Sequence, residues 1–163
     1  YMDLLNETLH QLRGEPMDNT TVDPEINLRI PAMIPDKYIS DIRIRLSYYK
    51  ALADISSQSD LEKIEGELKD QFGPIPEPAL NLMGLMLIRS QCKVLGIKDV
   101  SAGPKNVSLV FSEKTKMKPE TVIKLAMREN KKYSITPDNR LNIRMNVITW
   151  PAVYEELEYL IRL

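Results

Sequence analysis

The sequence has few of the residues that support covalent or metal chemistry. Its 163 residues include one cysteine, Cys92, and one histidine, His10. A single cysteine cannot form an internal disulfide, and no His/Cys spacing in the chain suits zinc. We therefore expect neither a disulfide nor a metal centre. A lone thiol in an apolar run also favours a reducing, cytoplasmic compartment.

Groups that could perform catalysis are equally scarce. His10 is expected to be a surface residue, and Cys92, on a helix predicted to be buried, is expected to act as a small hydrophobe because a reactive thiolate needs a cationic, exposed setting. The chain has no Gly-x-x-x-x-Gly-Lys loop and no Gly-x-Gly-x-x-Gly turn. We predict no catalytic residue and no cofactor, so an enzyme using Cys92 or His10 is the least supported hypothesis.

The sequence also lacks a charge excess and an export signal. Its 22 Lys and Arg nearly balance 23 Asp and Glu, so a charged partner must be bound by a local patch. Tyr1-Met2-Asp3-Leu4 lacks the basic start and long apolar stretch of a signal peptide. The apolar segment 79–95 includes Arg89 and Lys93, which argues against a membrane span.

The chain is predicted to contain a short leading segment and one folded module. Leu4, Leu5, Leu9 and Leu12 have helical spacing, which predicts a helix over 1–13 that is already under way at the first residue. We therefore expect the natural chain to extend upstream. Turn-forming residues over 14–24 predict a linker, which leaves 25–163 as the module.

Residues 25–163 predict an α+β fold. Alternation over 26–30 predicts a strand. Helical spacing marks three segments of a helical half (36 to 96): 36–54, 59–72 and 79–95, the last apolar nearly all round and therefore central. Alternation with turn residues predicts a mixed half (97 to 163) with two β-hairpins, a helix opened by Pro119 between them, and a C-terminal helix capped by Thr149.

Local patterns also predict helix starts and buried faces. Ser59 and Glu62 have the spacing of a capping box. The inward side chains of the 36–54 helix are expected to be Ile39, Ile42, Leu46, Tyr49 and Ala53. Those of the helix after Pro119 are expected to be Val122, Ile123, Ala126 and Met127. Three glutamates of the last helix are expected to face solvent: Glu155, Glu156 and Glu158.

A basic run lies between residues 113 and 132. It holds seven basic residues against three acidic ones, namely Lys114, Lys116, Lys118, Lys124, Arg128, Lys131 and Lys132. Tyr133 is the nearest aromatic residue, whereas a nucleic-acid surface more often interleaves stacking rings. The run favours a solvated face over a phosphate or protein contact.

An acidic run lies between residues 60 and 70, with five carboxylates against Lys63 and Lys69. Glu67 and Asp70 are separated by three residues, so they are neighbours on one helix face, opposite the predicted buried stripe. Spacing alone favours a solvated face. A partner that met this pair would best use arginine, whose fork matches carboxylate geometry.

Four motifs occur in a fixed order: Ile34-Pro35-Asp36-Lys37-Tyr38-Ile39-Ser40-Asp41, Arg45-Leu46-Ser47-Tyr48-Tyr49-Lys50, Glu67-Leu68-Lys69-Asp70-Gln71-Phe72-Gly73-Pro74 with Pro76, and Leu95-Gly96-Ile97. With the Leu4-Leu5 helix and the 25–30 strand, the series over residues 1 to about 100 resembles the C-terminal domain of bacterial transcription-repair coupling factors. Ala51 and Gln71 stand where this family often has arginine, so contacts of those arginines are not expected here.

The resemblance implies a non-catalytic module of an ATP-dependent DNA translocase that removes stalled RNA polymerase and recruits nucleotide-excision repair. The motor and its ATP would lie upstream. In this family the domain folds against a UvrB-like module and covers the UvrA-binding surface until polymerase is engaged, and the motif places Glu67 and Asp70 in that contact. Two alternatives remain: a nucleic-acid contact through Lys114 to Lys132, and a structural cap on the motor with Tyr1 to Arg13 as the docking helix.

Overall fold

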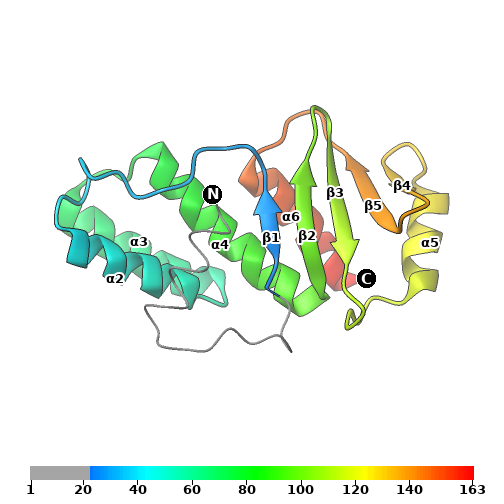
Figure 1. The fold of residues 1–163 in the computed structure, drawn as a ribbon, viewed down its shortest axis with the longest axis horizontal. Coiled ribbons are helices and arrows are strands. Elements are labelled where there is room, and N and C mark those ends of the chain that lie inside the picture. The colour runs from blue at the N-terminus through cyan, green and yellow to red at the C-terminus, as the bar shows by residue number, and fades with distance from the viewer. Residues whose placement is uncertain (1–22) are drawn as a thin grey trace. The chain divides into compact units, whose positions relative to one another are not determined.

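A computed structural model describes residues 23–163 (Figure 1). The α+β prediction is confirmed, since this part of the chain forms five helices and one mixed five-stranded sheet. It divides into two compact units, residues 30–90 and residues 91–163 with 23–29. The predicted helix over 1–13, His10 and all but the end of the predicted 14–24 linker lie outside the described residues.

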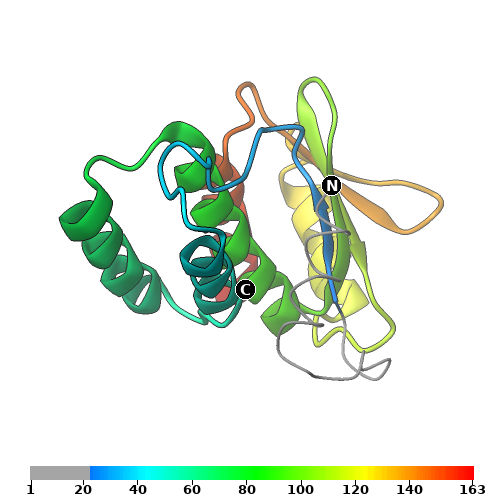
Figure 2. The same ribbon diagram turned by 60° about the vertical axis from the view of Figure 1, so that its left-hand side comes forward.

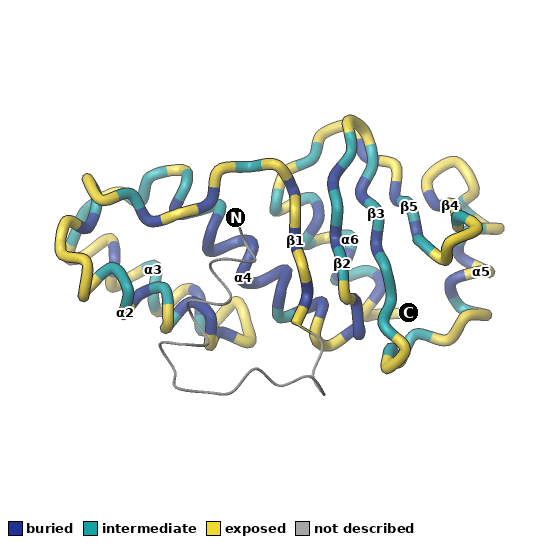
Figure 3. Tube along the Cα trace, viewed as in Figure 1, coloured by how far each residue is buried: buried dark blue, intermediate teal, exposed yellow. Residues whose placement is uncertain are grey.

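The first unit is helical. Its elements are α2 (Ile42–Ala53), α3 (Gln58–Phe72) and most of α4 (Glu77–Leu95), within which the division into units falls. Every residue from 82 to 89 of α4 is buried, as the dark blue of its central turns shows (Figure 3). The prediction of a central buried helix is therefore confirmed. Gly73 ends α3 with φ of 84°, a conformation that suits glycine.

The predicted helix over 36–54 starts later than expected. Asp41 is its N-cap, and the Asp41 carboxylate accepts a hydrogen bond of 2.8 Å from the Arg43 amide. Ile39 is buried in the turn before the helix, while Ile42 is 59% exposed. The predicted inward stripe was therefore wrong at Ile42, because its first member, Ile39, does not lie on the helix. The buried residues of α2 are Tyr48, Leu52 and Ala53.

The predicted capping box at Ser59 and Glu62 was also wrong. Ser57 caps α3, and its hydroxyl accepts a hydrogen bond of 3.2 Å from the Asp60 amide. The Asp60 carboxylate accepts in turn from the Ser56 amide at 3.0 Å, and this bond holds the pKa of Asp60 below its usual range. Both serine-to-acid spacings fit the motif in sequence, and the helix uses the one that begins two residues earlier.

The second unit contains the sheet. Its strands are β1 (Glu25–Asn27), β2 (Ile97–Ala102), β3 (Asn106–Phe111), β4 (Tyr133–Ile135) and β5 (Arg140–Arg144), in the order β1-β2-β3-β5-β4. Both predicted hairpins are confirmed, and β3 pairs with β5 to join them. β1 is parallel to β2 and ends before Arg29, whose φ of 59° is incompatible with a continued strand.

The two faces of the sheet differ in chemistry. On one face Val107, Leu109, Leu141 and Ile143 are buried, and α6 (Trp150–Arg162) lies behind the sheet in Figure 1. The other face has a row of small polar residues, one from each strand, placed by the register of pairing. In strand order these are Asn27, Ser101, Ser108, Asn142 and Ser134.

Two predicted faces of the second unit need correction. α5 (Pro119–Arg128), which lies beside β4 (Figures 1 and 2), buries Val122 and Leu125. Ile123 and Met127 were predicted to face inward but are 49% and 73% exposed, because the buried stripe includes Leu125 and lies on the adjacent side of the helix.

The glutamates of α6 do not all face solvent as predicted. Glu156 accepts a hydrogen bond of 3.0 Å from the Tyr133 hydroxyl, and Glu158 accepts one of 2.6 Å from the Gln91 amide. Only Glu155 of the three is exposed. A buried hydroxyl or amide needs a polar partner, and the helix face that borders the core supplies it.

Candidate functional site

Glu67 and Asp70 lie on the exposed face of α3. The same helix buries Leu61 and Leu68 on its other side. Both carboxylates are exposed, so neither is taken up by the core. Because α3 is a continuous helix of 15 residues, the pair is held at fixed spacing on a rigid element.

Two other acidic residues of α3, Asp60 and Glu65, have partners within the chain, whereas Glu62 is exposed and has none among residues 23–163. Asp60 bonds Ser56, and Glu65 pairs with Lys69 at 2.9 Å. In the segment that the structure describes, Glu67 and Asp70 form no ion pair and no hydrogen bond through their side chains. Their charges therefore remain available to an external partner.

The position of Asp70 is unfavourable for the helix itself. It lies in the last turn of α3, where the aligned peptide dipoles place partial negative charge. A carboxylate there is mildly destabilising, and Lys69 in the same turn is already paired with Glu65. Helix stability therefore does not account for an aspartate at this position.

An aromatic cluster holds the C-terminal end of α3 in place. The Tyr38 hydroxyl donates to the carbonyl of Gly73 at 2.8 Å and to that of Leu68 at 3.1 Å. The Phe72 ring packs against Tyr38 and Tyr48, with centroids 5.7 and 6.3 Å apart. These contacts add hydrogen bonds and ring packing at the carbonyl end of the helix and fix the turn that bears Asp70.

Glu67 contributes to the electrostatics of the same cluster. Burial raises the pKa of Tyr48, and the negative charge of Glu67 raises it further. Burial likewise raises the pKa of Tyr38, followed by a contribution from Tyr48. Both tyrosines therefore remain neutral near pH 7.

Several motif residues connect segments of the first unit through hydrogen bonds, a structural role that was not among the sequence predictions. Arg45 Nη1 donates to the carbonyl of Ile39 at 2.8 Å, and the Ile34 amide donates to the Tyr49 hydroxyl at 2.8 Å. Tyr38 has the role described above. The sequence signal for this role was the presence of Tyr38 before Arg45 and of Tyr49 after it, because a tyrosine hydroxyl that is buried on folding needs a hydrogen-bond partner.

Cys92 has the properties of a buried structural residue. It has 0% exposure, and burial raises the pKa of its thiol to about 12. The thiol is therefore protonated and inaccessible near neutral pH, which confirms the prediction that it acts as a small hydrophobe. Residues 23–163 contain no group of three or more His, Cys, Asp or Glu that could hold a metal ion. They also contain no helix long and apolar enough to cross a membrane.

The structure does not bring the predicted basic run together. Arg128 pairs with Glu129 at 3.6 Å, and Lys132 pairs with Glu156 at 2.6 Å. A recess of about 410 Å³ in the second unit is lined by Lys131 and Lys132 of the run. It is also lined by Lys105 and Arg144, which the sequence analysis did not single out.

Comparison with known proteins identifies relatives over most of the chain. A family model described as the TRCF domain matches residues 28–122. The transcription-repair-coupling factor of Escherichia coli K12 is 34% identical over 145 residues, covering 86% of this chain and 13% of that protein. The transcription-repair-coupling factor of Haemophilus influenzae Rd is 33% identical over 133 residues, covering 79% and 12%. The chain thus spans about an eighth of the length of these curated relatives.

A solved structure has the same fold. It is described as the crystal structure of the C-terminal domain of transcription-repair coupling factor. It superposes with a TM-score of 0.72 at 24% identity and covers 88% of this chain and 95% of its own.

Proposed function

Because the chain belongs to the TRCF domain family, we propose that it is a non-catalytic, autoinhibitory interaction domain of a transcription-repair coupling factor. In this proposal it contacts a UvrB-like module of the same polypeptide and covers the surface that binds UvrA. Engagement of stalled RNA polymerase releases the contact, in the cytoplasm. The domain needs no cofactor, and ATP is used only by an upstream translocase motor.

The observation that supports this proposal best is the state of Glu67 and Asp70. Both are exposed and without a partner within residues 23–163, on a helix whose end is fixed by Tyr38 and Phe72. A cationic surface, best supplied by arginine, could meet both carboxylates without rearrangement of α3. Preorganised charges of this kind favour specific recognition over nonspecific attraction.

The energetics suit a reversible contact. If the tether sets an effective concentration of ~1 mM and the bare contact has a dissociation constant of ~10 μM, the closed state is favoured by ~100-fold, or ~2.7 kcal/mol. A hydrogen bond to a charged group contributes on the order of 1.5–3 kcal/mol. Removal of one or both carboxylates would therefore open the contact substantially.

The test is the Glu67→Ala, Asp70→Ala double variant in the whole factor. We expect its affinity for UvrA to rise by about 10-fold or more, towards that of a factor truncated before this domain. Glu62→Ala is the matched control, because Glu62 is an exposed carboxylate of α3 one to two turns earlier, and we expect it to leave UvrA affinity unchanged. If the double variant and the wild type bind UvrA with equal affinity, and circular dichroism shows that the domain is folded, the pair does not have the role assigned to it.

A further inference from the structure

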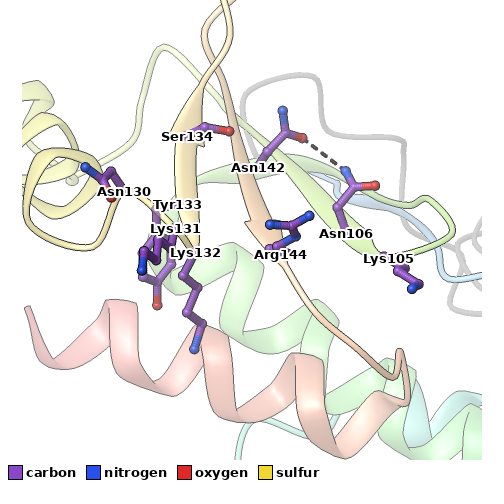
Figure 4. Close-up of a pocket in the computed structure, with 9 residues that line it drawn as sticks. All are labelled: Lys105, Asn106, Asn130, Lys131, Lys132, Tyr133, Ser134, Asn142 and Arg144. Atoms are coloured by element: carbon purple, nitrogen blue, oxygen red, sulfur yellow. Dashed lines mark hydrogen bonds between the residues drawn. The ribbon is translucent and has the colours of Figure 1, made fainter.

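A recess at one end of the sheet has a chemistry that the acidic site of α3 does not explain. It lies where β3 begins, β5 ends and β4 begins, with Asn106 and Arg144 paired across the strands. Its volume of about 410 Å³ is within the range of ligand sites. Its lining residues come entirely from the second unit, and each has a polar or charged group in its side chain: Lys105, Asn106, Asn130, Lys131, Lys132, Tyr133, Ser134, Asn142 and Arg144 (Figure 4).

The recess has a net positive charge and no acidic lining residue. Glu156 neutralises Lys132 at 2.6 Å, and the Lys132 ammonium lies 5.5 Å from the centre of the Tyr133 ring. Lys105, Lys131 and Arg144 have no carboxylate partner among residues 23–163. Three cations that lack a carboxylate partner in the described part of the chain therefore border one concave surface.

A hydrogen-bond network orients the amides of the recess. The Asn142 side-chain oxygen accepts from Asn106 Nδ2 at 3.2 Å (Figure 4), and it also accepts from the Ser108 hydroxyl. The Asn142 Nδ2 group is then left to donate elsewhere. The Asn106 amide packs against Gly103, where any Cβ would lie 2.3 Å from Asn106 Oδ1, so the glycine leaves the room that this amide occupies. The network thus presents a fixed donor beside the cations.

We propose that this recess binds backbone phosphates of duplex DNA. Lysine, arginine, asparagine and serine donors are those that contact phosphate oxygens in protein–DNA complexes. Tyr133 is 2% exposed, so the recess offers no ring on which an unpaired base could stack, which disfavours single strands. It also lacks the exposed aromatic or aliphatic anchor typical of a protein interface. The contact is therefore electrostatic and independent of base sequence.

The proposal makes a quantitative prediction about salt. Three phosphate contacts give a slope of about −2.7 for the logarithm of affinity against the logarithm of salt concentration. Affinity for a duplex should fall about 40-fold between 50 and 200 mM NaCl. Neutralising one of Lys105, Lys131 or Arg144 should reduce the magnitude of the slope by about 0.9.

The test measures fluorescence anisotropy of a labelled 20-base-pair duplex of mixed sequence with the 163-residue chain at 50 mM NaCl. The recess variant is Lys105→Gln, Lys131→Gln, Arg144→Gln. The control variant, Lys116→Gln, Lys118→Gln, Lys124→Gln, removes the same charge at exposed sites outside the recess. We expect the recess variant to lose at least about 10-fold in affinity and most of the salt slope, and the control to lose no more than about 3-fold.

Three results would overturn the proposal. Equal losses in both variants would mean that only the diffuse field of the protein attracts DNA, and absence of wild-type binding at 50 mM NaCl would exclude the site. Tighter Arg144-dependent binding of a poly-glutamate peptide would identify a docking site for an acidic protein instead.

A second measurement covers the case in which the triple variant does not fold. Duplex added to the isotopically labelled wild type should shift the backbone amide resonances of Asn106, Asn142 and Arg144, and shifts confined to other regions would contradict the assignment. The Glu67→Ala, Asp70→Ala variant should retain duplex binding, so failure of this proposal and failure of the autoinhibitory role are separable.

Discussion

At the scale of single residues, Tyr38 has the most specific structural role in the first unit. Its hydroxyl donates to two carbonyls at the end of α3, and its ring contacts Phe72. Tyr38→Phe keeps the ring and removes the donor, so we expect a loss of about 1–2 kcal/mol in unfolding free energy, measured by urea denaturation. Tyr154→Phe serves as a comparison on α6. No change at Tyr38 would mean that water replaces the hydroxyl at both carbonyls.

Gly66 offers a residue-scale test of the same helix without touching its charges. It lies in the middle of α3 with no atom within 4 Å of a Cβ placed there. Gly66→Ala should therefore stabilise the chain by about 0.8–1 kcal/mol, because alanine restricts the unfolded chain and has a higher helix propensity. A shift of the urea midpoint to higher concentration at constant slope would confirm this. A shift to lower concentration would show that the helix is strained at this point.

At the scale of elements, the start of α3 distinguishes two serines that the sequence alone leaves equivalent. Ser57 bonds the Asp60 amide, whereas Ser59 lies inside the helix. Ser57→Ala should cost about 1 kcal/mol of unfolding free energy, and Ser59→Ala should be close to neutral. Thermal unfolding of the two variants measures the difference. A larger loss for Ser59→Ala than for Ser57→Ala would indicate that Ser59 is the cap, as the sequence pattern predicted.

At the scale of the whole molecule, the burial of Cys92 is expected to make the free energy of unfolding depend on pH in the alkaline range. Its pKa is raised by burial from 9.0 to about 12 in the folded chain, so the folded thiol keeps its proton while the unfolded one loses it. The unfolded state then binds fewer protons above pH 9, and stability falls as pH rises from about 9 towards 12, by about 1.4 kcal/mol per unit.

The measurement is urea denaturation of the wild type and Cys92→Ala at pH 8, 9 and 10. Because other groups also titrate in this range, the quantity to compare is how steeply the free energy of unfolding falls with pH in each protein. The wild type should lose stability more steeply than the variant above pH 9, although the variant starts lower because it has a small cavity. Parallel slopes would mean that the thiol is accessible to solvent in the folded chain.

The shared exposed face of Glu67 and Asp70 could be predicted from sequence because it depends on local geometry, whereas their role in a contact was implied only by the family resemblance. The i, i+3 spacing of Glu67 and Asp70 fixes their shared face once α3 forms, and both are exposed as expected. Their lack of internal partners could not be predicted, because it depends on where every lysine and arginine of the fold lies. Their contact with another module remains a prediction.

The helix faces show the limits of local patterns. Apolar residues occupy a broad arc of α5, wider than the face that it buries, so its sequence is compatible with more than one buried stripe. Only packing against the sheet selects Val122 and Leu125 over Ile123 and Met127. The same reasoning applies to Ile42, whose position depends on where the cap at Asp41 begins the helix.

The sequence by itself determined the order of helices and strands, the turns between them and the inert character of Cys92, because each follows from spacing and composition over a few tens of residues. The family came from the resemblance of four ordered motifs and from the comparisons. Only the tertiary structure decided which charges meet. The pairing of β3 with β5 places Asn106 opposite Arg144, and the recess brings in Lys105 and Lys131 from separate loops. Such a set arises from strand register, which joins residues too far apart in the chain for any local pattern to connect.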